Sequence, residues 1–231
     1  MDHILDNPAF NALNTGNKEL AKGNGQAKYF PSDISPFAGL AENTPDNFKL
    51  LYDVAPVNAV FGFITPTEID FPDLWKVLQR MDVLQLMCET PARKAEANEQ
   101  IVPLGEEHIP AMLALTKLTN PGPFAQRTID FGHYKGVFEG DKLIAMTGQR
   151  LNPTPYAEVS AVCTHPDYLG RGYAAQLILN HVHRIKAASG IPFLHVLASN
   201  TRAINLYKSL GFVTRKQISI YIIQKELVSS Q

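Results

Sequence analysis

The second half of the chain has regular periods of apolar positions, and these predict most of its secondary structure. Within residues 171–189, Ala174, Leu177 and Ile178 begin a series at helical spacing, so we predict a long helix there. A Gly-Asp pair at residues 140–141 separates two apolar runs and predicts a tight hairpin turn. The other predictions are helices over residues 106–118 and 201–210, and strands over residues 134–139, 143–150, 156–164, 193–198 and 212–225, the last as one strand or two.

The first half of the chain is less regular. Leu74, Val77 and Leu78 share one face if residues 72–80 are helical. Residues 30–45 carry three prolines and few paired apolar positions, so we expect them to lie over another part of the protein rather than form a core. The charged, Ala-rich residues 90–100 are interpreted as a linker. Apolar runs further predict a short helix over residues 7–20, a buried strand over residues 58–64, a helix over residues 72–80 and a strand over residues 83–88.

Composition excludes several classes of protein. The chain has 231 residues, of which 45% are hydrophobic, and its 21 basic and 22 acidic residues leave a net charge of −1. This balance gives no support for nucleic-acid or membrane-surface binding. No apolar run approaches the roughly 20 residues of a membrane helix, and the acidic start of the chain is unlike a secretory signal, so we expect a cytoplasmic protein. Cys88 and Cys163 lie in apolar surroundings and are interpreted as free buried thiols.

Candidate chemistry is concentrated between a predicted strand and the long helix. Gly170 and Gly172 stand in the loop before that helix, where glycines allow a ligand to approach the backbone. The free N–H groups and the dipole of a helix N-terminus favour phosphate. The loop lacks the Gly-Lys-Ser/Thr of a P-loop and the third glycine of a dinucleotide fingerprint. Taken alone, it leaves a phosphate site and a plain tight turn both open.

Two motifs in this region resemble the GNAT superfamily of acetyltransferases. The family's loop pattern, Gln/Arg-x-x-Gly-x-Gly/Ala, falls on Leu169-Gly170-Arg171-Gly172-Tyr173-Ala174, with Leu169 departing from the usual Gln or Arg. A second pattern follows after a helix and a strand, and it matches at every fixed position from Asn200 and Ala203 through Leu206-Tyr207 to Gly211-Phe212. The resemblance covers about residues 101–225, and the run over residues 157–166 looks most like the glycine N-acyltransferase branch.

The resemblance implies a fold and an arrangement of domains. We expect an α/β (α+β) protein with a mixed, mostly antiparallel sheet flanked by helices, and with a V-shaped opening at the strand that meets the donor. The GNAT domain would span residues 100–231. Residues 1–95 would form a smaller α/β lobe, interpreted as an extension or a degenerate copy of the same fold.

The resemblance also implies acetyl-CoA as the acyl donor. Backbone groups of Val162, Cys163 and Thr164 would face the pantetheine arm, and one N–H there would polarise the thioester carbonyl. Asn200 would cap the following helix, contact the pantetheine, or do both. The residues expected around the diphosphate are Gly170, Arg171, Gly172, Tyr173 and Ala174.

Tyr207 and Glu158 are the predicted catalytic residues. By resemblance, Tyr207 is the acid that protonates the departing thiolate, and Glu158 is the base that deprotonates the amine or a ligand of the substrate ammonium. His165 is the second candidate for the base, whereas His181 and His195 are interpreted as packing residues. No cluster suggests a metal, and no motif suggests a covalent nucleophile. Direct transfer in a ternary complex is therefore expected.

The sequence thus predicts transfer of an acetyl group from acetyl-CoA to a primary amine. The acceptor is a small-molecule amine, an amino acid or a protein amine, and a homodimer is left open. Two alternatives remain: amino-acid N-acylation with a longer acyl-CoA, and a CoA-binding sensor without catalysis. A plain nucleotide-binding domain is disfavoured by the second motif.

Overall fold

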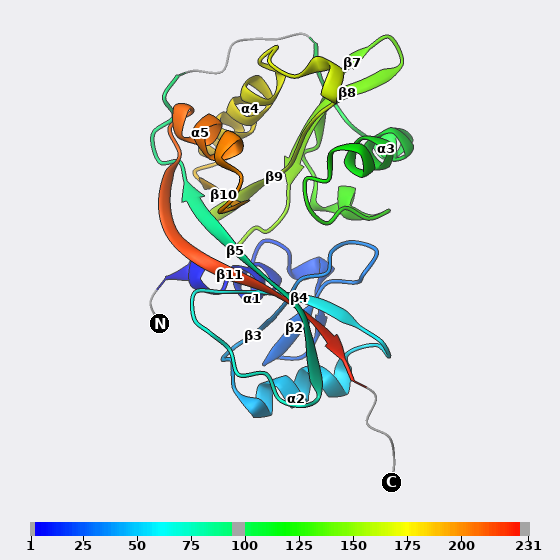
Figure 1. The fold of residues 1–231 in the computed structure, drawn as a ribbon, viewed down its shortest axis with the longest axis vertical. Coiled ribbons are helices and arrows are strands. Elements are labelled where there is room, and N and C mark those ends of the chain that lie inside the picture. Colours follow the sequence, from blue (N-terminus) through cyan, green and yellow to red (C-terminus); the bar gives the residue numbers. More distant parts are fainter. Residues whose placement is uncertain (1–2, 94–99, 227–231) are drawn as a thin grey trace.

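The computed structural model describes residues 3–93 and 100–226, and its centre is one eight-stranded sheet (Figure 1). The strand order is β4-β11-β5-β10-β9-β8-β7-β6. Its strands are β4 (Val60–Thr65), β5 (Trp75–Met87), β6 (Ile101–Pro103), β7 (Lys135–Glu139), β8 (Lys142–Gln149), β9 (Tyr156–Thr164), β10 (Ile191–Leu197) and β11 (Val213–Lys225). All pairs are antiparallel except the central pair of β9 and β10, as expected for a mixed, mostly antiparallel sheet.

Helices cover both faces of this sheet. Successive strand residues point to opposite faces, so Phe193 belongs to a core cluster with helices α1 and α3, whereas Leu194 belongs to one with α4 and α5. Figure 1 shows α4 and α5 on the side of the sheet opposite to α3. The helices are α1 (Pro8–Asn14), α2 (Pro45–Val54), α3 (Ile109–Thr119), α4 (Tyr173–Ala187) and α5 (Thr201–Ser209).

The parallel strands β9 and β10 are paired over only part of their length. Their ladder runs from Tyr156–Ile191 to Glu158–Phe193 and then ends, although β9 continues to Thr164. Ala161 has a positive φ of 51°, and the register between β8 and β9 shifts beside it. The bulge turns the end of β9 away from β10. This is the V-shaped opening that the sequence predicted.

The segment predicted as a helix over residues 72–80 is a strand. Trp75 begins β5, whose 13 residues pair with β11 over their whole length. Val77 and Leu78 are 44% and 48% exposed, so they do not form the buried face of a helix. The long antiparallel pairing with β11 therefore outweighs the helical spacing of apolar residues within this segment.

The N-terminal part contains more structure than its composition predicted. A second sheet joins β1 (Lys22–Gly23), β2 (Ala27–Tyr29) and β3 (Ala38–Leu40), and α2 packs beside it. Phe30, Ile34 and Phe37 are at most 2% exposed and lie in the same core cluster as Phe193. The prediction that residues 30–45 contribute no core was therefore wrong.

The two halves of the chain share the main sheet. The strand β5 precedes residue 95 and pairs with both β10 and β11, and β11 also pairs with β4 (Figure 1). The predicted linker falls mostly on residues 94–99, which lie outside the described residues, and the predicted domain boundaries stay a prediction. Within the described ranges, no helix is long and apolar enough to cross a membrane.

Candidate functional site

The loop before α4 has the backbone geometry that its glycines predicted. Gly170 and Gly172 have φ angles of 78° and 82°, which residues with side chains rarely adopt. A Cβ atom on Gly170 would meet open space, and one on Gly172 would meet only Gln176 Nε2 at 3.8 Å. The loop backbone is therefore open to a ligand.

The N-terminus of α4 has no side-chain cap. Gly172 is its N-cap residue and accepts only the Gln176 N–H, over 3.1 Å. Within the described ranges, the N–H groups of residues 170–175 have no hydrogen-bond acceptor. A helix of 15 residues adds its dipole to these free donors. Such an end is suited to an anion of the size of a phosphate group.

Arg171 and Tyr168 flank this loop. The Arg171 guanidinium lies 4.8 Å from the centre of the Tyr168 ring and donates a hydrogen bond to the Asp167 carbonyl at 3.4 Å. The Tyr168 hydroxyl donates to Glu139. No carboxylate in the described part of the chain forms an ion pair with Arg171, so its charge remains available beside the free N–H groups.

The end of β9 contributes groups on both sides of the strand. The Cys163 side chain is buried in the core beside α3, and burial raises the pKa of its thiol to about 12. Val162 is half-buried against the cluster that contains α4 and α5. The Thr164 hydroxyl is buried and has no hydrogen-bond partner within residues 3–93 and 100–226. An unpartnered hydroxyl at this position fits a polar ligand that lies along the strand.

The helix α5 holds Tyr207 and Asn200 next to this strand. Asn200 is the N-cap of α5, and its side chain accepts the Ala203 N–H over 3.1 Å, which confirms the capping alternative. Tyr207 is 8% exposed and packs edge-on against Phe212. Burial, together with nearby Cys163, raises the pKa of Tyr207 to about 12. Burial and Cys163 perturb its hydroxyl, and no hydrogen bond to another described residue contributes to the raised pKa.

Glu158 lies at the last paired position before β9 and β10 separate, and its side chain is fully buried. Both of its oxygens accept hydrogen bonds from Arg150, over 2.6 and 2.9 Å, and Oε1 lies 2.7 Å from His195 Nδ1. Burial alone would raise the pKa of this carboxyl group. Arg150 and His195 outweigh burial and hold that pKa well below its ordinary value. The carboxylate therefore keeps its charge.

A chain of polar side chains extends from Glu158 across the sheet. The Gln85 amide nitrogen lies 2.9 Å from His195 Nε2, so Nε2 accepts and the proton is on Nδ1, which donates to Glu158. Gln85 also accepts from Arg215, which pairs with Asp6. The interpretation of His195 as a packing residue missed this network. One signal for this network was present in the sequence: His195 and Gln85 are polar residues that each interrupt an apolar strand.

The other candidate histidines have different surroundings. His165 accepts the Asp167 N–H at 3.3 Å and caps the short helical turn before the glycine loop. His181 is fully buried on α4 next to Arg184, and neither of its ring nitrogens has a hydrogen-bond partner among the described residues. Burial first, and then the charge of Arg184, lower the pKa of His181 to about 3. The interpretation of His181 as a packing residue thus holds for its burial, but its ring nitrogens lack the hydrogen bonds expected of a buried histidine in the described part of the chain.

In this mixed sheet, the parallel pair β9 and β10 separates beside the glycine loop and the uncapped start of α4. This arrangement is the acyltransferase architecture of the GNAT type. The chain belongs to the GNAT family of acetyltransferases. It aligns over 98% of its length with the whole of a crystal structure from Novosphingobium aromaticivorans that is assigned to this family, at 35% identity and a TM-score of 0.90. Residues 134–220 match the family described as FR47-like protein.

Two further relatives are more distant. The N-alpha-acetyltransferase RimI of Mycobacterium tuberculosis is 35% identical over 83 residues, which are 35% of this chain and 51% of RimI. The chain thus matches about half the length of this curated relative. A GCN5-related N-acetyltransferase from Kribbella flavida shares the fold, with a TM-score of 0.60 at 11% identity over 94% of each chain.

Proposed function

We propose that this protein transfers an acetyl group from acetyl-CoA to a primary amine by direct attack in a ternary complex. The uncapped start of α4, with its two glycines of positive φ, carries the proposal. It lies next in sequence to the end of β9, which has separated from its parallel neighbour. Membership of the GNAT family supports the same donor.

The residues expected to hold acetyl-CoA have free polar groups. Residues 170–174 would bind the diphosphate through their backbone N–H groups, with Arg171 adding a charge-assisted contact. Residues 162–164 would hold the pantetheine arm, and the amide nitrogen of Asn200 remains available because only its oxygen caps α5. When bound, acetyl-CoA supplies an acetyl group activated as a thioester.

Tyr207 is the proposed proton donor for the leaving sulfur. Its raised pKa keeps the proton on Oη throughout the neutral range. A thiol has an ordinary pKa near 8.5, so the proton is transferred from a weaker acid. The gain in rate is therefore expected at the low end of general acid catalysis, about 10²-fold.

Glu158 is proposed as a positioning residue. A base must take up a proton, and the lowered pKa of Glu158 weighs against that role. Where β9 and β10 separate, its oxygens hold His195 of β10 and Arg150, which directly follows β8. The carboxylate would thus fix the geometry of the opening rather than take the proton of the amine.

The acceptor is proposed as an amine of a small molecule, an amino acid or a protein. The name of RimI describes an N-alpha-acetyltransferase, which supports an α-amino group. The likeness of residues 157–166 to the glycine N-acyltransferase branch supports an amino acid and a longer acyl group as the second candidate. The N-terminal lobe would shape the acceptor pocket or pack on the far side of the sheet.

Thermal unfolding with ligands tests the donor, and thiol release tests the reaction. Acetyl-CoA should raise the melting temperature more than ADP or ATP at equal concentration, whereas stabilisation by ADP or ATP alone would refute the CoA site. A panel of glycine, simple amines and a peptide with a free N-terminus should then release thiol with at least one acceptor. Stabilisation without thiol release from any acceptor, and with either acetyl-CoA or a longer acyl-CoA, would favour the sensor.

A further inference from the structure

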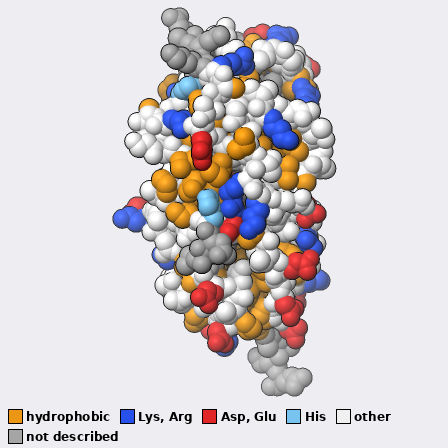
Figure 2. Space-filling view, turned by 90° about the vertical axis from the view of Figure 1, so that its left-hand side faces the viewer, with side chains coloured by type: hydrophobic (Ala, Val, Ile, Leu, Met, Phe, Trp, Pro, Cys, Tyr) orange, Lys and Arg blue, Asp and Glu red, His pale blue; other side chains and the backbone are white. Residues whose placement is uncertain are grey.

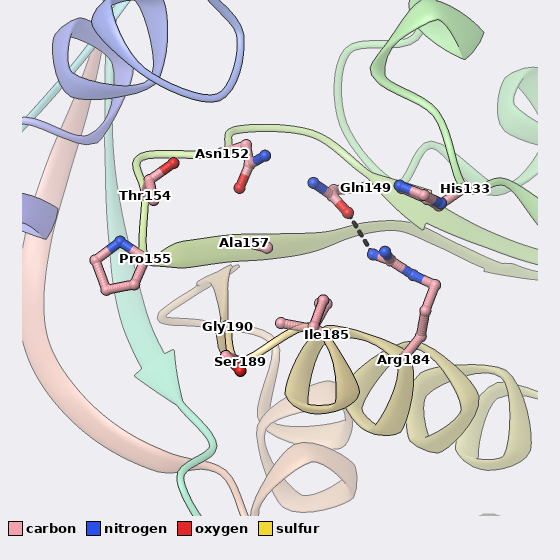
Figure 3. A pocket seen from close by; sticks show the side chains of 11 residues that line it. His133, Gln149, Asn152, Thr154, Pro155, Ala157, Arg184, Ile185, Ser189 and Gly190 are labelled. Carbon is pink, nitrogen blue, oxygen red and sulfur yellow. Dashed lines mark hydrogen bonds between the residues drawn. The ribbon is translucent and has the colours of Figure 1, made fainter.

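A second cavity lies at the other end of α4 from the glycine loop. It has a volume of about 320 Å³ and opens between the last turns of α4, the start of β9 and the segment before β7 (Figure 3). Arg184 lies 11 residues beyond Tyr173, so the cavity is about 16 Å along the helix from the candidate diphosphate site. The two sites therefore do not overlap.

The cavity is lined by both polar and apolar side chains. Figure 3 shows Gln149 and Arg184 joined across it by a hydrogen bond, with Asn152 and Thr154 on the loop above and His133 beyond them. The apolar surface comes from Pro155, Ala157, Ile185 and Ala188. The volume of the cavity is at the lower end of the range for small-molecule sites, so it suits a compact ligand.

Arg184 brings a positive charge that has no ion-pair partner within residues 3–93 and 100–226. Its Nη2 donates to Gln149, but its Nε is buried and has no hydrogen-bond partner in the part of the chain that the structure describes. No Asp or Glu lines the cavity. The C-terminal end of α4 supplies about half a negative charge, and Lys186 lies in the same turn, so most of the charge of Arg184 remains unopposed.

Lys135 adds to this positive potential, whereas the nearby histidines do not. Lys135 Nζ lies 2.8 Å from Asn180 Oδ1, one turn before Arg184 on α4. Burial lowers the pKa values of both His133 and His181, and the charges of Arg184 and Lys135 lower them further. Arg184 of α4, His133 before β7 and the neutral Gln149 of β8 line the cavity. Lys135 of β7 and the buried His181 of α4 lie near Arg184 but do not line it.

We propose that this cavity binds a small molecule through a carboxylate or phosphate group held by Arg184. The planar guanidinium can donate two parallel hydrogen bonds to either group. Gln149 and Thr154 supply neutral hydrogen-bonding groups at the rim, where Figure 3 shows them. This site does not depend on the proposed acetyl transfer.

Amide NMR of the full chain tests the proposal, with acetate and inorganic phosphate added separately at constant ionic strength. Either anion should shift the Ala157 and Gly190 amide signals saturably, and the anion that binds more tightly identifies carboxylate or phosphate as the preferred group. Signals of Gly170 and Gly172 report on the diphosphate site independently. Shifts confined to those two glycines, or no shifts at all, would overturn the second site without affecting the first.

Three variants separate a built site from general attraction of anions. Arg184→Gln should weaken anion binding at Ala157 and Gly190 about ten-fold or more, the loss expected for a charge-assisted hydrogen bond. Lys117→Gln removes the same charge from the exposed surface of α3 and should leave binding unchanged. Arg184→Lys keeps the charge without the planar fork and should bind more weakly than the wild type. If Arg184→Gln does not fold, the affinity of Arg184→Lys for the anion tests the proposal instead. Wild-type affinity in either Arg184 variant would overturn the proposal.

Discussion

Glu158 Oε1 on β9 accepts a hydrogen bond from His195 Nδ1 on β10 over 2.7 Å, across the strand pair that separates at this point. Arg150 holds the same carboxylate from the other side. The fully buried Glu158 carboxylate thus forms an ion pair with a largely buried Arg150 beside the opening, and the strength of this pair can be measured.

The substitution Glu158→Gln should lower the free energy of unfolding by about 3–5 kcal/mol, because it leaves the Arg150 cation buried without its counter-ion. Chemical denaturation at neutral pH measures this loss. Glu19→Gln is the control, since the Glu19 side chain is 87% exposed and its removal should change little. Equal stability of both variants would contradict the ion pair.

The contribution of Glu158 should also depend on pH. The pKa of Glu158 is lowered in the folded protein, so its carboxylate is protonated at a higher pH in the unfolded chain than in the folded one. Below about pH 4.5, the ordinary pKa of this group, unfolding therefore takes up a proton. The stabilisation is complete above that value and decreases as the pH falls towards the lowered pKa. The difference in unfolding free energy between the wild type and Glu158→Gln should therefore shrink between about pH 5 and pH 3. A difference that stays constant over this range would show that the pKa is not lowered.

Tyr207→Phe should reduce turnover about 10²-fold with little change in the affinity for acetyl-CoA, because it removes only the proposed proton donor. The free energy of unfolding should hardly change, since no hydrogen bond from a described residue contributes to the raised pKa of this hydroxyl. Tyr221→Phe provides a matched control: Tyr221 is 6% exposed, packs beside Phe71 and belongs to a different core cluster from Tyr207. Turnover that is unchanged in Tyr207→Phe would remove this residue from the mechanism.

Two substitutions of Asn200 separate its cap from its proposed contact with the donor. Asn200→Ala should lower the unfolding free energy by about 1 kcal/mol, as expected for loss of an N-cap. Asn200→Asp keeps the capping oxygen but lacks the amide N–H groups, so it should retain stability and bind acetyl-CoA more weakly. Full affinity in Asn200→Asp would limit the residue to capping.

The positions of the β7–β8 hairpin, β9, α4 and α5 could be predicted from the sequence because their signals are local. The strand β9 was predicted with the bounds Tyr156–Thr164 that the structure has, and α4 begins two residues after the predicted start. Gly170 and Gly172 predict a backbone with positive φ, which few other residues adopt. The GNAT motifs are likewise short runs of consecutive residues, so the family could be inferred without a structure.

Contacts between distant segments decided the rest. The first half of β5 looked helical because the apolar spacing of residues 72–80 fits a helix, whereas its second half was predicted as a strand. Only pairing with β11, more than a hundred residues later, makes Trp75–Met87 one continuous strand. The register of four strands aligns Glu158 with His195, Gln85 and Arg215, and no local pattern encodes that register. Residue types and short spacings thus determined the family and the candidate donor site, whereas the buried ion pair and the cationic cavity depended on long-range packing, which sequence spacing does not record.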